Sequence, residues 1–240
     1  MTFELQDIDP EVDFPALARC LFESYEDPPQ KFFHVFFPIH GTGAEAREEA
    51  IIEAAERLKL WRINDPTSYW QKAVDTATER IAGGALWNIY EENPFANPQS
   101  PEVTWFPPGG SRTFVEKVLE NHARPRSKAA QKPHIYLFII FTHPNYQRRG
   151  VGQQFIDWGI KKSNEVGVDI YLDSTPYGRP LYEVNSFEYV EENVNIPVTE
   201  NPDEAWKEIE EKVGPFTFWL MRRPVNGGHR GDLAQRHEPV

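Results

Sequence analysis

The amino-acid sequence predicts a protein of the α/β class. Residues 135–141 are seven successive apolar side chains, which is typical of a strand buried on both faces. After a turn that contains two glycines, residues 153–158 begin an amphipathic helix. Alternating apolar residues at 69–74 and 80–90 predict a β-hairpin. Strands and helices thus alternate along the chain, as the α/β class requires.

Further elements follow from shorter patterns. A strand is predicted at 3–8, and the Asp13, Phe14 and Pro15 sequence indicates a helix start. Pro144 cannot donate to a strand ladder, so the buried strand is expected to end near Thr142. The remaining predicted elements are helices up to residue 25 and over 44–60 and 203–212, and strands at 168–172, 187–190 and 216–221.

Length and charge limit the possible functions. A chain of 240 residues can bury one substantial core, so we expect a single domain over 1–224, followed by a disordered tail at 225–240 that lacks a hydrophobic period. The formal net charge of −12 argues against nucleic acid as a partner. Cys20 alone cannot form an internal disulfide. The seven histidines show no metal-ligand spacing, so no metal is predicted.

Targeting signals are not evident. No apolar stretch reaches about 18 residues, and the first residues are acidic rather than basic, so neither a membrane span nor a signal peptide is predicted. The expected compartment is the cytoplasm, with the nucleus as an alternative.

Residues 91–133 interrupt the pattern with seven prolines and a basic run at 124–132. Only 112–121 is predicted to be helical. A loop of this length is unusual within a domain and is often functional. We expect either a lid over a substrate site or a passive surface insertion.

The turn after the buried strand is suited to binding an anion. Gly150 and Gly152 let a ligand approach the backbone, the first amides of the following helix have no internal partner, and Arg148 and Arg149 add positive charge. A dinucleotide-binding turn would need a small residue where Phe155 stands, and the Gly-Lys-Ser/Thr of a P-loop does not occur. An ordinary crossover with a glycine turn would leave the paired arginines unexplained.

Two motifs together carry a family resemblance. Pro144, Gln147, Gly150 and Gly152 form P-x-x-Q-x-x-G-x-G, which resembles the coenzyme A signature of the GNAT acetyltransferases. Residues 178–187 resemble the family's A-x-x-L-Y-x-x-x-G-F helix, with glycine in the alanine position and serine in the glycine position. The resemblance implies a mixed, largely antiparallel central sheet with flanking helices and a splayed parallel strand pair that binds acyl-CoA.

The resemblance also implies a coenzyme site and a proton donor. Acetyl-CoA is the expected co-substrate, and its pantetheine would pair with the end of the buried strand. Tyr182 occupies the position of the family's usual general acid, and a phenol stays protonated at pH 7. Its alternative role is core packing beside Leu181 and Phe187. The residues expected to bind the coenzyme are Ile140, Phe141, Thr142, Gln147, Arg148, Arg149, Gly150, Val151, Gly152 and Gln153.

The general base stays open. The buried strand offers only Tyr136, while His134 and His143 flank it and Asp173 follows the next strand. Each has an ordinary structural alternative, such as a surface histidine or a helix cap. Deprotonation through water, or by a residue of 91–133, is a further possibility.

The predicted function is that of an acetyl-CoA-dependent acyltransferase, one that transfers groups other than amino-acyl groups. We expect N-acetylation of a small-molecule amine by direct transfer in a ternary complex. The alternatives are a non-catalytic acyl-CoA-binding protein of the same fold and a protein N-acetyltransferase. The sequence identifies neither the acceptor nor the oligomeric state.

Overall fold

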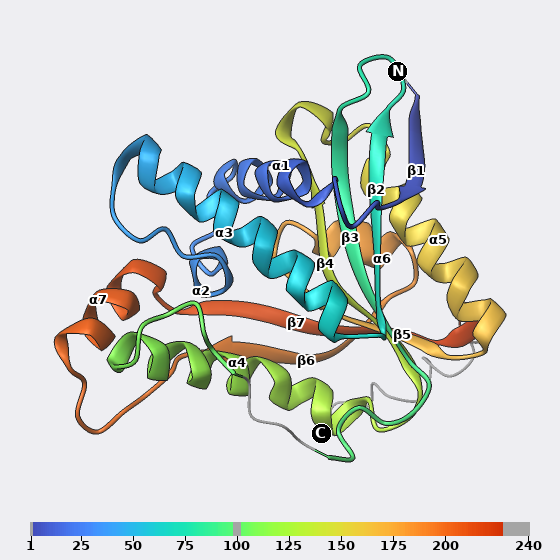
Figure 1. Ribbon diagram of the computed structural model, residues 1–240. Coiled ribbons are helices and arrows are strands. Elements are labelled where there is room, and N and C mark those ends of the chain that lie inside the picture. The colour runs from blue at the N-terminus through green and yellow to red at the C-terminus, as the bar shows by residue number, and fades with distance from the viewer. Residues whose placement is uncertain (1, 98–101, 228–240) are drawn as a thin grey trace.

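A seven-stranded mixed sheet runs through the centre of the molecule (Figure 1). The computed structural model describes residues 2–97 and 102–227. The strand order is β1-β2-β3-β4-β5-β7-β6. The strands are β1 (Phe3–Asp7), β2 (Ser68–Asp75), β3 (Ile81–Tyr90), β4 (His134–Thr142), β5 (Asp169–Ser174), β6 (Glu188–Asn195) and β7 (Phe216–Arg223). The helices are α1 (Phe14–Glu26), α2 (Phe33–Phe36), α3 (Gly43–Asn64), α4 (Gly110–Ala129), α5 (Val151–Val166), α6 (Arg179–Val184) and α7 (Glu204–Val213), with 3-10 turns η1 (Pro144–Tyr146) and η2 (Val225–Gly227).

One pair of neighbouring strands is parallel. β4 and β5 run in the same direction with register from His134 opposite Asp169 to Leu137 opposite Leu172. The other neighbouring pairs are antiparallel. This arrangement confirms the predicted fold class, and the predicted hairpin is β2–β3.

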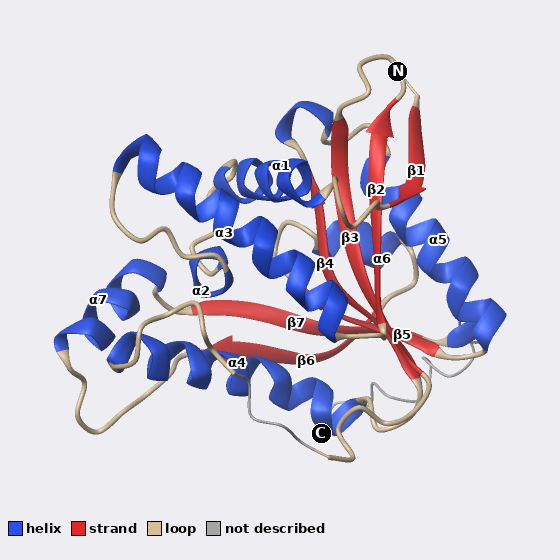
Figure 2. Cartoon of the chain, viewed as in Figure 1, coloured by secondary structure: helices blue, strands red, loops and turns tan. Residues whose placement is uncertain are grey.

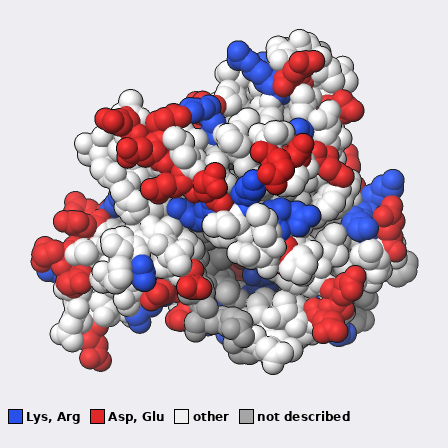
Figure 3. All heavy atoms as spheres, in the orientation of Figure 1, with Lys and Arg blue, Asp and Glu red and all other residues white. Residues whose placement is uncertain are grey.

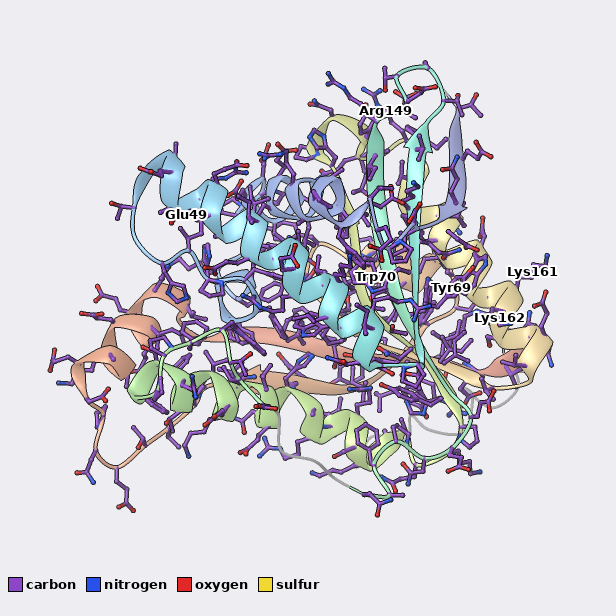
Figure 4. All side chains as sticks on the ribbon, in the orientation of Figure 1. Glu49, Tyr69, Trp70, Arg149, Lys161 and Lys162 are labelled. Atoms are coloured by element: carbon purple, nitrogen blue, oxygen red, sulfur yellow. The ribbon has the colours of Figure 1, made fainter. Side chains whose placement is uncertain are left out.

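Helices cover both faces of the sheet (Figure 2). α1 and α3 pack on one face, and α5 packs against β3, β4 and β5 on the other. Neighbouring side chains of β2 point to the two faces of the sheet (Figure 4). Trp70 packs edge-on against Phe14 of α1, with ring centroids 5.6 Å apart. Tyr69 stacks on Trp158 of α5, with ring centroids 4.8 Å apart. Successive side chains of a strand point to opposite faces, so both cores draw on the same strand.

Glycines allow close packing at two places on β3. A side chain at Gly83 would overlap the backbone oxygen of Phe141 on β4, so the two strands approach closely here. The ring of Trp87 on β3 fills the space above Gly159 of α5. These contacts fix the separation of α5 from the sheet.

The segment 91–133 is more ordered than its prolines suggest. Helix α4 extends well beyond the predicted 112–121 and includes Pro125. Phe114 and Val118 of α4 are buried against α7, and Asn195 of β6 donates a hydrogen bond to the Val118 oxygen at 2.9 Å. Pro125 leaves the Asn121 oxygen without its helical donor, and Asn193 of β6 donates to that oxygen at 3.0 Å, a contact between distant segments that the prediction could not include when it ended the helix at 121.

The first three residues of the predicted tail fold against α5 and β5. Residues 225–227 form η2, where the Val225 amide donates to Asp169 and the Asn226 amide donates to Asn164, both at 2.9 Å. The rest of that predicted tail, 228–240, lies outside the described residues.

Acidic side chains gather over α3 on the face seen in Figure 3. This helix carries five glutamates, among them Glu49, which is labelled in Figure 4. The exposed side of α3 therefore contributes to the acidic balance of the chain: Glu45, Glu48, Glu49, Glu53 and Glu56.

Candidate active site

The parallel strands β4 and β5 separate in the middle of the sheet. Their pairing ends at Leu137 and Leu172, although β4 continues to Thr142. A bulge begins here, since Trp87 pairs with Leu137 and Leu86 pairs with Ile139, leaving Phe138 as an extra residue. From this point β4 presents backbone groups along an edge that β5 does not cover. An extended ligand can pair with such an edge.

A cavity of about 620 Å³ lies along this open edge. It extends from the turn before α5, past β4, to side chains of α2, α4, β5 and β7. Arg149 does not line the cavity and is exposed in the same turn, near the top of Figure 4. The other residues predicted for coenzyme binding do line it: Ile140, Phe141, Thr142, Gln147, Arg148, Gly150, Val151, Gly152 and Gln153.

The glycine turn has the backbone conformation that an anion site needs. Gly150 caps α5 with a φ of +89°, and Arg148 has a φ of +59°. The first turn of α5 contains no acidic residue. Its first amides have no partner within the helix and lie at the positive end of the helix dipole. Gly152 is needed for packing, because a Cβ there would lie 3.1 Å from Leu181 of α6.

Tyr182 lies on α6, where the motif predicts it, and lines the same cavity. Its side chain is buried, and burial raises its pKa further above the ordinary value of a phenol, so it is protonated at neutral pH. Gly178 leaves room for the ring, since a Cβ there would lie 2.9 Å from Tyr182 Cε2. Ser186, in the motif's glycine position, has a φ of +63°, the left-handed conformation in which glycine is favoured.

Three polar side chains meet at the opposite end of the cavity. The Tyr136 hydroxyl donates to Asp173 Oδ2 at 2.8 Å, and His122 Nε2 of α4 lies 3.6 Å from the same oxygen. The Arg126 guanidinium lies over the Tyr136 ring, 3.5 Å from its centroid. Burial is the main cause that lowers the pKa of His122, opposed by Asp173, so the imidazole is neutral at pH 7.

The other two sequence candidates for the base lie elsewhere. His134 is buried, with Nδ1 2.7 Å from the Lys132 oxygen, and it does not line the cavity. His143 pairs with Glu23 of α1 at 3.0 Å and likewise lies outside the lining. Tyr136 and Asp173 therefore remain from the sequence candidates, and the structure adds His122.

His122 was not singled out by sequence, although a signal existed. Phe114, Val118 and His122 follow one another at intervals of four residues and so share one face of a helix. The first two are core residues, which places the third on the buried side of α4. The prediction ended the helix at 121 and missed this placement.

Aromatic rings surround this polar group. Four phenylalanines of the segment 32–37 line the cavity, and two of them, Phe33 and Phe37, also belong to the core: Phe32, Phe33, Phe36 and Phe37. The Phe218 ring of β7 lies 4.8 Å from His122 and 4.8 Å from Phe32, both edge-on. The polar group of Tyr136, Asp173 and His122 is therefore bordered by aromatic rings.

The fold and the cavity are those of a protein that can bind an extended ligand where two parallel strands, β4 and β5, separate. The sequence profile of the acetyltransferase (GNAT) family matches residues 21–187. The chain belongs to the GNAT acetyltransferase family, which confirms the resemblance drawn from the two motifs.

Solved structures share the fold. The C-terminal condensation domain of Ebony, in complex with β-alanyl-dopamine, is similar with a TM-score of 0.62 and 16% identity, covering 94% of this chain and 100% of that one. The histone acetyltransferase HPA2 and related acetyltransferase of Corynebacterium glutamicum gives 0.54 and 18%, covering 94% and 97%. The PaiA N-acetyltransferase of Thermoplasma acidophilum, in complex with coenzyme A, gives 0.50 and 13%, covering 93% and 99%.

The described residues contain neither a membrane-spanning helix nor a metal-binding cluster. Among residues 2–97 and 102–227, no helix has the length and apolar character that crossing a membrane requires. In the same part of the chain, no group of three or more His, Cys, Asp or Glu side chains is arranged to bind a metal ion.

Proposed function

We propose that this protein is an acetyl-CoA-dependent N-acetyltransferase that acts on a small-molecule amine by direct transfer in a ternary complex. One observation carries the proposal: a single cavity joins the glycine turn, the open edge of β4 and the polar group at Asp173. Donor and acceptor can therefore meet in one cavity, which direct transfer requires.

The donor end of the cavity suits the chemistry of coenzyme A. The first amides of α5 and the Arg148 guanidinium can hold a pyrophosphate. The uncovered edge of β4 from Phe138 to Thr142 can pair with the amides of a pantetheine arm. The family membership and the coenzyme A complex of PaiA support acetyl-CoA as the co-substrate.

Tyr182 is the proposed proton donor. Its phenol lines the cavity and is protonated at neutral pH because of its burial. A proton delivered to the thiolate as the carbon–sulfur bond breaks makes coenzyme A a better leaving group.

Two other functions remain to be separated from this one. A protein of the same fold that only binds acyl-CoA would not need a buried phenol and a neutral imidazole in one cavity. Acetylation of a protein N-terminus would need room for a peptide, whereas α4 places His122 in the wall of the acceptor end. We therefore favour a small acceptor, with α4 closing one side of its site.

The test is the release of thiol from acetyl-CoA with a panel of amines and peptides that carry free N-termini, comparing wild type with Tyr182→Phe. We expect turnover with small amines and a loss of about 100-fold or more in kcat for the variant, with little change in its KM for acetyl-CoA. Tight acetyl-CoA binding without thiol release from any acceptor would favour the binding protein. A chain that binds no coenzyme A would refute both functions.

A further inference from the structure

We propose that the acceptor is a monoamine on an aromatic or arylalkyl body, whose ammonium group binds to Asp173 and gives its proton to His122. This inference deepens the proposed function and rests on it. It names the substrate class and the base, neither of which the two sequence motifs address.

Asp173 has an unfilled capacity to accept hydrogen bonds. Its side chain is 4% exposed, and Oδ2 accepts one bond from Tyr136. Oδ1 is buried, has no hydrogen-bond partner within the described residues, and belongs to a residue that lines the cavity. A buried carboxylate is costly without a compensating cation. An ammonium group from the ligand provides that charge and a further donor to the carboxylate, at Oδ2 beside the bond from Tyr136.

His122 is placed to share that ammonium group. The 3.6 Å between its Nε2 and Asp173 Oδ2 is too long for a direct hydrogen bond. A nitrogen at about 2.9 Å from each of these two atoms closes the triangle with ordinary hydrogen bonds. The charged and titratable groups around His122 are Asp173 on β5, Arg126 on its own helix, and Tyr136 on β4 next to Asp173.

The surrounding rings select the body of the acceptor. Phe36 lies 6.3 Å from the Phe138 ring and 6.3 Å from His122, while Phe218 faces His122 from the strand β7. Aromatic faces attract both apolar rings and cations. A flat ring connected to an amine by a short linker matches this combination of rings and one carboxylate.

Charge excludes other common amines. Of the described residues that line the cavity, Asp173 is the one acidic side chain, so a diamine would leave its second ammonium group unpaired. Arg148 lies at the coenzyme end, and Arg126 lies over the Tyr136 ring but does not line the cavity, so the carboxylate of an amino acid would meet no cavity-lining cation at the acceptor end. A single positive charge on an apolar body remains.

In the proposed transfer, each proton that leaves the nitrogen has an acceptor. The ammonium group gives one proton to His122, and the free amine attacks the thioester carbonyl, forming a carbon–nitrogen bond. The carbon–sulfur bond breaks, and the thiolate takes a proton from Tyr182. The nitrogen loses its second proton, which returns to Tyr182 as the amide forms, and His122 releases its own proton to water.

Binding is the first test, because it does not require turnover. Protein saturated with coenzyme A is titrated with 2-phenylethylamine by calorimetry, and with 2-phenylethanol, phenylalanine and putrescine as comparison ligands. We expect the amine to bind at least about tenfold more tightly than the three others, since an unpaired buried charge costs more than 1.4 kcal/mol. Asp173→Asn should weaken that binding by about tenfold or more. Glu208→Gln, which removes an exposed carboxylate of α7 outside the cavity, is the matched control.

The outcomes separate this inference from the proposed function. Equal binding of phenylethylamine by wild type and Asp173→Asn, or no binding by wild type, overturns the inference even if another amine is acetylated. Binding that depends on Asp173 without any acetylation refutes the enzyme and leaves the amine site. Circular dichroism and thermal unfolding of each variant establish that it is folded, and Asp173→Glu provides a second substitution at the same place that keeps the charge.

Kinetics tests the proton role of His122. His122→Gln should lower kcat by about 100-fold while the Kd for phenylethylamine changes by less than about threefold. The wild-type rate should fall on acidification through the pKa of His122, and that limb should be missing from the variant. An unchanged kcat, or an unchanged pH limb in the variant, would assign the deprotonation to another group.

Discussion

The packing of α5 on β3 can be tested by adding one methyl group at Gly159. A Cβ there would lie 2.7 Å from Cζ3 and 2.9 Å from Cζ2 of Trp87. The Trp87 ring is fully buried, donates from Nε1 to Gln71 at 3.1 Å and packs on Trp158, so it cannot move aside cheaply. Overpacking of this kind costs about 1 to 3 kcal/mol, while alanine gains about 1 kcal/mol of helix propensity over glycine.

Because three atoms of this fixed ring would lie within 3.0 Å of the Cβ, we expect a cost in the upper half of that range, and the net effect of Gly159→Ala is then a loss of about 1 to 2 kcal/mol in the free energy of unfolding. For a protein of this size that lowers the Tm by roughly 2 to 8 °C. Thermal unfolding followed by circular dichroism, with urea midpoints as a second measure, gives the value. Lys161→Ala is the control on the same helix, because this side chain points away from the sheet (Figure 4) and a surface change should stay within about 0.5 kcal/mol.

A double-mutant cycle isolates the contact. Trp87→Phe removes the indole atoms that the new methyl group would meet, so Gly159→Ala in that background should cost little or even stabilise the helix. The coupling energy between the two changes should be at least about 1 kcal/mol. The reasoning fails if Gly159→Ala costs the same in both backgrounds, or if it raises the Tm of the wild type.

Two further predictions concern charge. Arg148→Ala should weaken coenzyme A binding several-fold, and more than Arg149→Ala does, because of these two arginines Arg148 lines the cavity. Both effects should become smaller at high salt, which calorimetry at two ionic strengths measures. A larger effect of Arg149→Ala would contradict the assignment. Burial lowers the pKa of three histidines: His34, His122 and His134. On acidification the unfolded chain therefore binds protons near pH 6.5, before the folded protein does. The free energy of unfolding then falls below that pH, by up to about 1.4 kcal/mol per pH unit for each histidine. Unfolding midpoints between pH 7 and 5.5 measure the slope, which should be shallower in His134→Gln; a Tm that is flat or rises on acidification would rule this explanation out.

The donor half of the candidate site could be read from the sequence because its residues are close together in the chain. The run at 135–141, the glycine turn and the start of α5 are successive segments, and their local patterns determine a strand, a turn and a helix. Tyr182 follows in a short motif of its own. The predicted strand 187–190 ended too early, because β6 continues to Asn195 through its pairing with β7. Contacts between distant strands leave no signal in the local sequence.

The acceptor half could not be predicted in the same way. Asp173 was noted as a possible cap, but its contact with Tyr136 depends on the register of two parallel strands. His122 reaches that pair only because α4 packs on β6 and α7. Phe218 comes from β7, which the chain inserts between β5 and β6. No spacing within the sequence encodes such contacts between distant segments.

This difference between the two halves has a consequence for specificity. The donor site is built into the sheet and the packing of α5, so changes there disturb the core around Trp87 and Phe141. The acceptor end uses single side chains from α2, α4, β5 and β7, each of which also has an outer support: α4, for example, is held by buried Phe114 and Val118 rather than by His122. A substitution at 122 or 218 can therefore alter the acceptor while the coenzyme site keeps its shape. The segment that interrupts the sequence pattern, residues 91–133, is also the segment that supplies the proposed base.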